Sequence, residues 1–171
     1  MPTQTQFSAG GLVYKKENNQ VLWLLRLPRA NPKYRAKIVW TFSKGWLDDT
    51  ANGTRPGPLA SGQIKATSDQ IQAAALREVA EEGGVKAKII TKLKTIKIFF
   101  ADEDKNKVLK FITYFLMEYQ KDLPQGPGQE TEAVIWLSYE AARQKLGYSS
   151  ERQLLDLAHQ KLPAPVQENF L

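Results

Sequence analysis

The sequence predicts a single α/β domain over residues 1–171. Runs rich in β-forming residues lie before and after one strong helical pattern at 69–83, and two further helical patterns close the chain at 138–146 and 149–162. Residues are 42% hydrophobic and 25% charged, which is typical of a globular protein of this length. We find no internal repeat, domain linker or low-complexity tract.

The first half begins with a predicted hairpin. Apolar runs at 7–16 and 20–27 are joined by Glu17, Asn18 and Asn19, which are polar turn formers. A basic, proline-containing loop follows at 28–37, and the short apolar piece IVWTF predicts a strand at 38–42.

A long loop is predicted from residue 43 to residue 67. Its turn signals include Asn52-Gly53 and Pro56-Gly57-Pro58. Loops of this length are uncommon in compact domains and are often functional.

The segment 69–83 is the clearest helix. Thr67, Ser68 or Asp69 can cap its start, and the glycines that begin at Gly83 supply a stop. Ile71, Ala75 and Val79 recur at helical spacing and predict the face turned to the core.

The sequence of the second half predicts two long strands, at 86–100 and 107–119, which are joined by a polar turn. A proline-glycine loop at 123–129 leads to a short strand at 132–137. Ser149 or Ser150 is expected to cap the last helix.

The composition excludes disulfide bonds, thiolate metal sites and zinc sites built from several histidines. There is no cysteine and one histidine, His159, which we expect at the surface. Any metal must therefore be bound mainly by oxygen, as Mg²⁺, Mn²⁺ and Ca²⁺ are. The net charge of +6 favours anionic partners, although the lysines are scattered rather than grouped.

No signal peptide is recognised at the N-terminus, and no apolar stretch reaches the roughly 20 residues that span a bilayer. We therefore expect a cytoplasmic protein with no membrane partner.

Three acids crowd one end of the predicted helix 69–83. Glu78, Glu81 and Glu82 are spaced i, i+3 and i+4, so an α-helix would present them on one face. At about 100° per residue, Glu82 projects about 20° from Ile71 of the core stripe. Crowded carboxylates raise each other's pKa, and a divalent cation reverses that penalty. On these residues alone, a solvated charged face and a metal site both remain open.

The surroundings of these acids resemble the signature of the Nudix hydrolase family, G-x5-E-x7-R-E-U-x-E-E-x-G-U, where U is aliphatic. The match is in register from Asp69 through Arg77, Glu78, Glu81 and Glu82 to Gly84-Val85. Upstream, SAGGLVY resembles the family's first strand and WTFSKGWLD its W-x-F-P-K-G-x-x-E motif; TYFLMEY and ETEAVIWLS also look like family elements. The resemblance covers residues 7–162.

Three features depart from the pattern. Asp69 replaces glutamate at the first acid, and Ser43 replaces the proline before Lys44. Residues 46–68 number 23 where the pattern has five, which is an insertion of 18 residues, placed at about 49–67. This insertion either shapes substrate access or is an inert surface loop.

The resemblance implies an α/β/α sandwich with a mixed sheet, and an enzyme that uses Mg²⁺ or Mn²⁺. Matching positions suggest the Gly45 carbonyl and the side chains of Glu78, Glu81 and Glu82 as metal ligands. Arg77 would orient these acids, and Asp69 is a further candidate for that role.

A further acid often precedes the family's last core strand. Glu130 is preferred to Glu132 for that ligand, and either Glu78 or Glu130 would serve as general base, with Glu82 completing the catalytic set.

For the substrate, the resemblance suggests Lys44 as a phosphate contact, with Arg26 and Lys110 as further candidates. Tyr114, Phe42 or Tyr148 would stack on a base, although aromatic residues in strands are more often core. Asp48 stands at the acid of the K-G-x-x-E motif and is a further candidate.

The expected reaction is hydrolysis of a pyrophosphate linkage in a nucleoside diphosphate linked to another moiety. The chain ending in YSSERQLLDLA resembles the branch acting on dinucleoside polyphosphates and nucleoside triphosphates, including oxidised ones. Alternatives are an ADP-ribose pyrophosphatase, an RNA 5′-pyrophosphohydrolase, in which case the RNA 5′ end would be the only nucleic-acid partner, and a non-catalytic nucleotide-binding module. The sequence indicates no oligomeric state.

Overall fold

We analysed a computed structural model, which describes residues 2–31 and 38–164. Its strands are β1 Gln4–Glu17, β2 Gln20–Pro28, β3 Ser43–Trp46, β4 Asp49–Thr50, β5 Arg55–Pro56, β6 Val85–Ala101, β7 Lys107–Asp122 and β8 Thr131–Leu137. Its helical segments are α1 Ser68–Glu78, the π-helical turn η1 Val79–Gly83, α2 Tyr139–Lys145 and α3 Ser149–Gln160.

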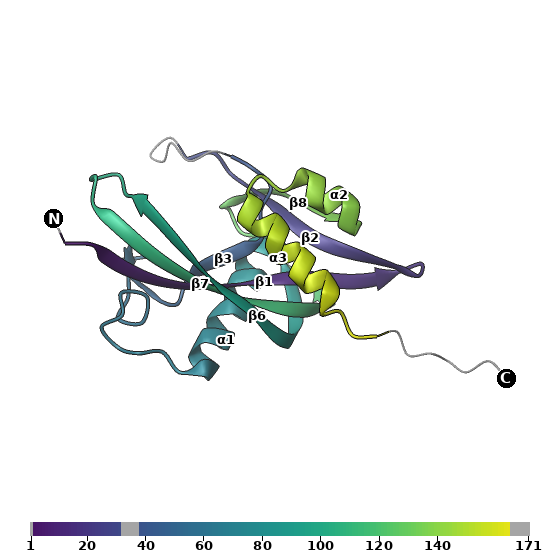
Figure 1. The fold of residues 1–171 in the computed structure, drawn as a ribbon, viewed down its shortest axis with the longest axis horizontal. Coiled ribbons are helices and arrows are strands. Elements are labelled where there is room, and N and C mark those ends of the chain that lie inside the picture. The colour runs from purple at the N-terminus through teal and green to yellow at the C-terminus, as the bar shows by residue number, and fades with distance from the viewer. Residues whose placement is uncertain (1, 32–37, 165–171) are drawn as a thin grey trace.

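The main sheet is mixed, as predicted. Its strands follow the order β6-β7-β1-β2-β8. β3 also pairs with β1, along residues 8–11, whereas β2 pairs with residues 14–17 of β1. β1 and β7 are parallel, whereas the other pairs are antiparallel. β1 therefore lies at the centre and carries neighbours from both halves of the chain (Figure 1).

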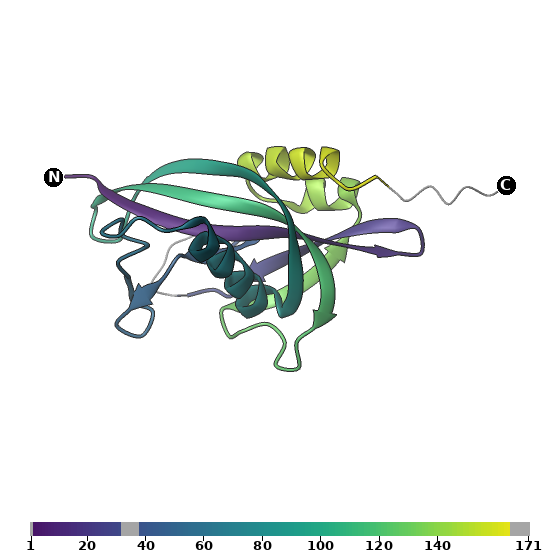
Figure 2. The same ribbon diagram turned by 90° about the horizontal axis from the view of Figure 1, so that it is seen from below.

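Helices cover both faces of this sheet, which confirms the α/β/α sandwich. On one face, Ala75 and Val79 of the acid-bearing helix pack against Val13 and Met117. On the other face, α2 and α3 bury a second core around Trp23 (Figure 2).

Both predicted hairpins are present. Asn18 and Asn19 have φ values of 53° and 62° between β1 and β2, the left-handed conformation that a two-residue hairpin loop requires. β6 pairs with β7 over most of its length, with irregularities that interrupt the expected alternation.

The predicted strand at 38–42 is wrong. Trp40 forms an isolated bridge with Leu146, and Thr41 forms one with Arg26, so the two residues pair with different partners and make no ladder. A strand forms instead at 43–46, inside the segment that we predicted as loop. Of the predicted loop 28–37, residues 32–37 lie outside the described residues.

The predicted N-terminal cap is confirmed for α1 and wrong for α3. Thr67 caps α1 and forms a reciprocal capping box with Gln70. The cap position of α3 is Tyr148, which makes no side-chain capping bond, so the expected serine cap is wrong.

The inserted segment 49–67 contains the β4–β5 hairpin and a series of turns. Asp48 anchors it, because its two carboxylate oxygens accept the N–H groups of Leu59 at 3.0 Å and Ala60 at 2.8 Å. The Ala60 carbonyl in turn accepts the Phe7 N–H at 2.7 Å, which attaches the insertion to β1.

None of the described helices is long and apolar enough to cross a membrane. The cytoplasmic location expected from the sequence stays a prediction.

Candidate active site

The acid-bearing helix changes its winding where the acids begin. The α-helix ends at Glu78 and continues as the π-helical turn η1, which closes at Gly84 with a φ of 72°. A π turn is wider than an α turn and often marks a functional site. We expected three acids on one face of an α-helix; instead the Glu78 side chain is 12% exposed and the Glu81 side chain 62%, so Glu81 turns outward.

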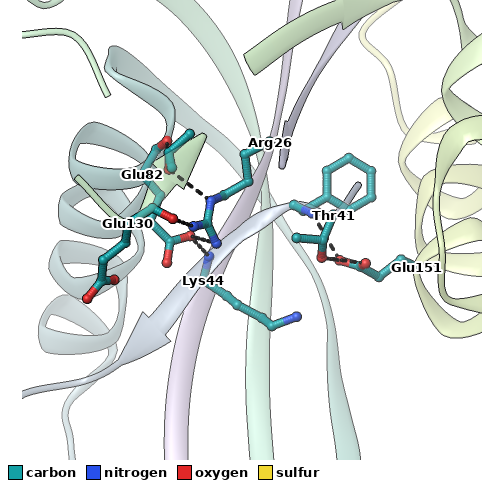
Figure 3. Close-up of polar contacts among 8 residues, drawn as sticks. Arg26, Thr41, Lys44, Glu82, Glu130 and Glu151 are labelled. Carbon is teal, nitrogen blue, oxygen red and sulfur yellow. Dashed lines mark hydrogen bonds and ion pairs between the residues drawn. The ribbon is translucent and has the colours of Figure 1, made fainter. Parts of the chain in front are cut away.

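Glu82 lies at the buried end of this turn. Its Oε2 atom lies 3.1 Å from Arg26 Nη1 and accepts the Lys44 backbone N–H at 3.0 Å (Figure 3). Burial raises the pKa of the Glu82 carboxyl from 4.5 to about 7, although the Arg26 charge opposes that shift. Both contacts use the same oxygen, so no described donor occupies the other one.

Glu78 faces β3 at Gly45. A Cβ on Gly45 would lie 2.3 Å from the Glu78 carboxyl carbon, so a side chain at this position would displace the Glu78 carboxylate. Burial raises the pKa of Glu78, and the nearby Glu81 charge adds to the rise. Arg77 opposes it through Nη2, 3.3 Å from Glu78 Oε1.

Arg77 joins the acid helix to the loop before it. Its Nη2 also donates to the carbonyls of Trp46, at 2.8 Å, and Leu47, at 3.3 Å. This placement agrees with the orienting role that the resemblance implies, but the described contacts of Arg77 do not include Asp69. Asp69 lies exposed in the first turn of α1.

Arg26 is buried beneath the acids. Besides Glu82, its guanidinium donates to the Glu130 carbonyl at 2.9 Å and to the Thr131 hydroxyl at 3.1 Å. Thr131 then donates to the Glu82 carbonyl at 2.8 Å. The guanidinium of Arg26, a candidate phosphate contact, is thus already bonded to protein groups. Thr131 is a supporting residue that no sequence motif indicated.

Two lysines and a tyrosine lie together beside the acids. Lys110 has a pKa lowered from 10.5 to about 8, first by burial and then by the charge of Lys44. The Lys44 ammonium lies 5.8 Å from the centre of the Tyr148 ring, which is 40% exposed. This cluster offers two positive charges and an open aromatic face.

Tyr114 lies elsewhere, inside the core beneath α3, and burial raises its pKa well above 10.0. Its ring is therefore not accessible for stacking in this structure.

The two candidate acids at the start of β8 differ: Glu130 directly precedes the strand and Glu132 lies in it. The Glu130 side chain is exposed, yet its charge contributes to the raised pKa of Glu78, so the two carboxylates lie within electrostatic reach. Glu132 forms an exposed ion pair with Arg29 at 3.1 Å.

The donors suit a hard divalent cation. The Glu78 charge raises the pKa of Glu82, and the charges of Glu81 and Glu130 raise that of Glu78, a cost that a cation removes. Within the described residues no three histidine, cysteine, aspartate or glutamate side chains are gathered around one point, because Glu81 and Glu130 face outward.

An α/β/α sandwich whose helix α1–η1 carries inward acids at its C-terminal end is the arrangement expected of a Nudix-type protein. A family model described as NUDIX domain matches residues 4–158, and the chain belongs to this family. The family predicted from the sequence is thus confirmed. Nudix hydrolases generally use divalent metals.

A curated relative is the putative mutator protein MutT4 of Mycobacterium tuberculosis (strain CDC 1551 / Oshkosh). It is 27% identical over 163 residues, which are 92% of this chain and 56% of the relative. The chain therefore spans little more than half the length of that protein.

Solved structures show the same fold. An Ap4A hydrolase binary complex of C. elegans has a TM-score of 0.63 and 20% identity, covering 91% of this chain and 96% of that one. The NUDIX domain of Shewanella oneidensis NrtR complexed with ADP ribose has a TM-score of 0.61 and 18% identity, covering 95% and 91%.

Proposed function

We propose that the protein is a metal-dependent hydrolase that cleaves a pyrophosphate linkage in a nucleoside diphosphate linked to another moiety. One observation carries the proposal: Glu78 and Glu82 are held inward beside Lys44 and Lys110. Acids that attract a cation and lysines that attract phosphate thus share one site.

Glu78, Glu82 and the backbone of Gly45 would hold Mg²⁺ or Mn²⁺, with Glu81 and Glu130 as further ligands once their side chains turn inward. A bound ion of this kind lowers the pKa of water and stabilises charge on phosphate oxygens.

Lys44 and Lys110 would neutralise the phosphate groups and hold the linkage in place. Glu130 is our choice for the general base, because it is exposed, forms no ion pair among the described residues, and lies within electrostatic reach of Glu78. Glu78 is the alternative base. Arg77 orients the acids rather than contacting the substrate.

Dinucleoside polyphosphates and nucleoside triphosphates, including oxidised ones, are the substrates that we favour. The open Tyr148 ring beside Lys44 supports a base stacked next to the phosphates. The names of the relatives, an Ap4A hydrolase and a mutator protein, agree with this choice.

The first test is product release with Mg²⁺ and with EDTA. The substrates are diadenosine tetraphosphate, an oxidised guanosine triphosphate, ordinary triphosphates, ADP-ribose and 5′-triphosphate RNA. We expect turnover of diadenosine tetraphosphate and of the oxidised guanosine triphosphate with Mg²⁺, and no turnover with EDTA. Turnover of ADP-ribose or of RNA alone would select one of the alternatives, and no turnover would favour a binding module.

Two variants test the assigned residues. Glu82→Gln should abolish turnover, and Glu130→Gln should lower kcat by about 10²–10⁴-fold, as loss of a general base does. Glu132→Gln is the matched control, since Glu132 pairs with Arg29 at the surface. Unchanged hydrolysis by Glu82→Gln would refute the site.

A further inference from the structure

A second buried acid lies outside the metal-binding set. Glu151, in the first turn of α3, is 2% exposed. Its two carboxylate oxygens lie 2.6 Å and 2.7 Å from the Thr41 hydroxyl, and the Phe42 N–H donates to it at 3.1 Å (Figure 3). Among the described residues, no lysine or arginine forms an ion pair with it.

A carboxylate is a costly choice for such a position. Burying a charge without a cationic partner is unfavourable unless donors surround it. The hydroxyl, the backbone N–H and the N-terminal turn of α3 supply favourable partial charges. In return, hydrogen bonds to an ionised acceptor are shorter and stronger than neutral ones, so Glu151 fixes its partners firmly.

The partners of Glu151 belong to the segment 40–46, which leads into the active site. The Trp40 carbonyl accepts the Gly147 N–H at 3.2 Å, so the α2–α3 connection also grips this segment. Thr41 exchanges two backbone hydrogen bonds with Arg26, both at 2.9 Å.

A few residues further on, the same segment contacts both inward acids. The Lys44 N–H donates to Glu82, and Gly45 lies against the Glu78 carboxylate. The side chain of Arg26, whose backbone pairs with Thr41, reaches Glu82 as well. Glu151 is thus linked to Glu82 by two short paths. One runs through Thr41 to Arg26, and the other runs along the chain from Phe42 to Lys44.

We infer that Glu151 is a positioning residue of the active site. By holding Thr41 and Phe42, it sets where Lys44 and Gly45 lie against the acids, and it makes α3 part of the support of the site. The inference deepens the proposed function and rests on it for its kinetic consequence.

The kinetic test uses Thr41→Val and Glu151→Leu, which remove either side of the contact. Thr41→Ser keeps the hydroxyl, and Glu140→Leu, in the first turn of α2, is the matched control. We expect kcat to fall about tenfold or more in the first two variants, since small misplacements near the chemistry are costly. Thr41→Ser, which keeps the hydroxyl, should keep the wild-type kcat.

Amide hydrogen exchange gives a readout that does not need activity. Thr41→Val and Glu151→Leu should speed exchange in residues 40–46, while β6 keeps its protection and Thr41→Ser behaves as the wild type. Thr41→Val keeps the size of the side chain, so it stays informative if Glu151→Leu fails to fold.

The outcomes separate the two proposals. Local loss of protection with a fall in kcat supports the positioning role. Unchanged exchange in 40–46, a uniform loss of protection, or a local loss without a fall in kcat would overturn it. A wild type without turnover refutes the proposed function, and with it the catalytic meaning of Glu151, whereas a wild type with turnover and unaffected variants refutes the inference alone.

Discussion

Arg26 Nη1 lies 3.1 Å from Glu82 Oε2, and both side chains are buried. Removing one partner from a buried ion pair leaves an unpaired charge, which costs about 3–5 kcal/mol. Arg26→Met should therefore lower the free energy of unfolding by about that amount, measured by urea denaturation.

The chain offers a matched control at the surface. Arg29 and Glu132 are also 3.1 Å apart, but their side chains are 56% and 57% exposed. Arg29→Met should change the stability by less than about 1 kcal/mol, as is usual for exposed pairs. Equal effects of the two substitutions would contradict the structural role of Arg26.

Metal binding should depend on pH through Glu82, whose pKa is raised from 4.5 to about 7. The folded state binds a proton at Glu82 more tightly than the unfolded state does. Without metal, the contribution of protonated Glu82 to the free energy of unfolding is therefore lost as pH rises from 4.5 to about 7. The ionised acid that remains above that window is the form that binds a cation.

Saturating Mg²⁺ should accordingly raise Tm by about 5–10 °C at pH 8, which corresponds to a concentration near one hundred times Kd. Most of the shift should disappear at pH 5.5, and EDTA should reverse it. Differential scanning fluorimetry measures both, with Glu82→Gln expected to show no shift at either pH. A shift of equal size at the two pH values would argue against Glu82 as a ligand.

Phosphate binding should weaken at high pH through Lys110, whose pKa is lowered to about 8. As pH rises through that value the ammonium loses its charge, so KM for a polyphosphate substrate should increase between pH 7 and pH 9. Lys110→Arg should remove this dependence, because arginine stays charged. A wild-type KM that stays constant over this range would exclude Lys110 from phosphate binding.

The inserted segment should depend on Asp48 and not on Asp69. Asp48→Ala leaves the Leu59 and Ala60 N–H groups without their acceptor, which costs about 1–3 kcal/mol. Asp69→Ala should change the stability by no more than about 0.5 kcal/mol, because that side chain is exposed. Urea denaturation of the two variants decides whether the anchoring acid lies before the insertion or after it.

The sequence predicted the layered fold because hydrophobic periodicity and turn residues are local signals. The hairpin at Asn18 and Asn19 and the cap at Thr67 follow from such signals. The short strand at 43–46 does not, because it exists through its pairing with β1, far away in the chain.

Within the site, sequence spacing identified the acids but not their directions. Val79 to Glu82 are all compatible with an ordinary α-helix, so nothing in their composition indicated the π turn that separates Glu81 from Glu82. Arg26 and Thr131 meet only after β2 has paired with β8, so no local pattern could assign them to each other. Tyr114 and Tyr148 look alike in sequence, and only packing shows that one is core and the other open.

The parallel pairing of β1 with β7 has a consequence for how the chain acquires its structure. Gln4 lies opposite Val108 and Tyr14 opposite Glu118, so β1 is synthesised well before β7 and meets this neighbour only once residues 108–118 exist. Contacts between residues so distant in sequence slow folding, because loop-closure entropy must be overcome before they form. During synthesis the first hairpin must therefore wait with both of its outer edges unpaired, since β2 also pairs later with β8, and unpaired strand edges are prone to aggregation.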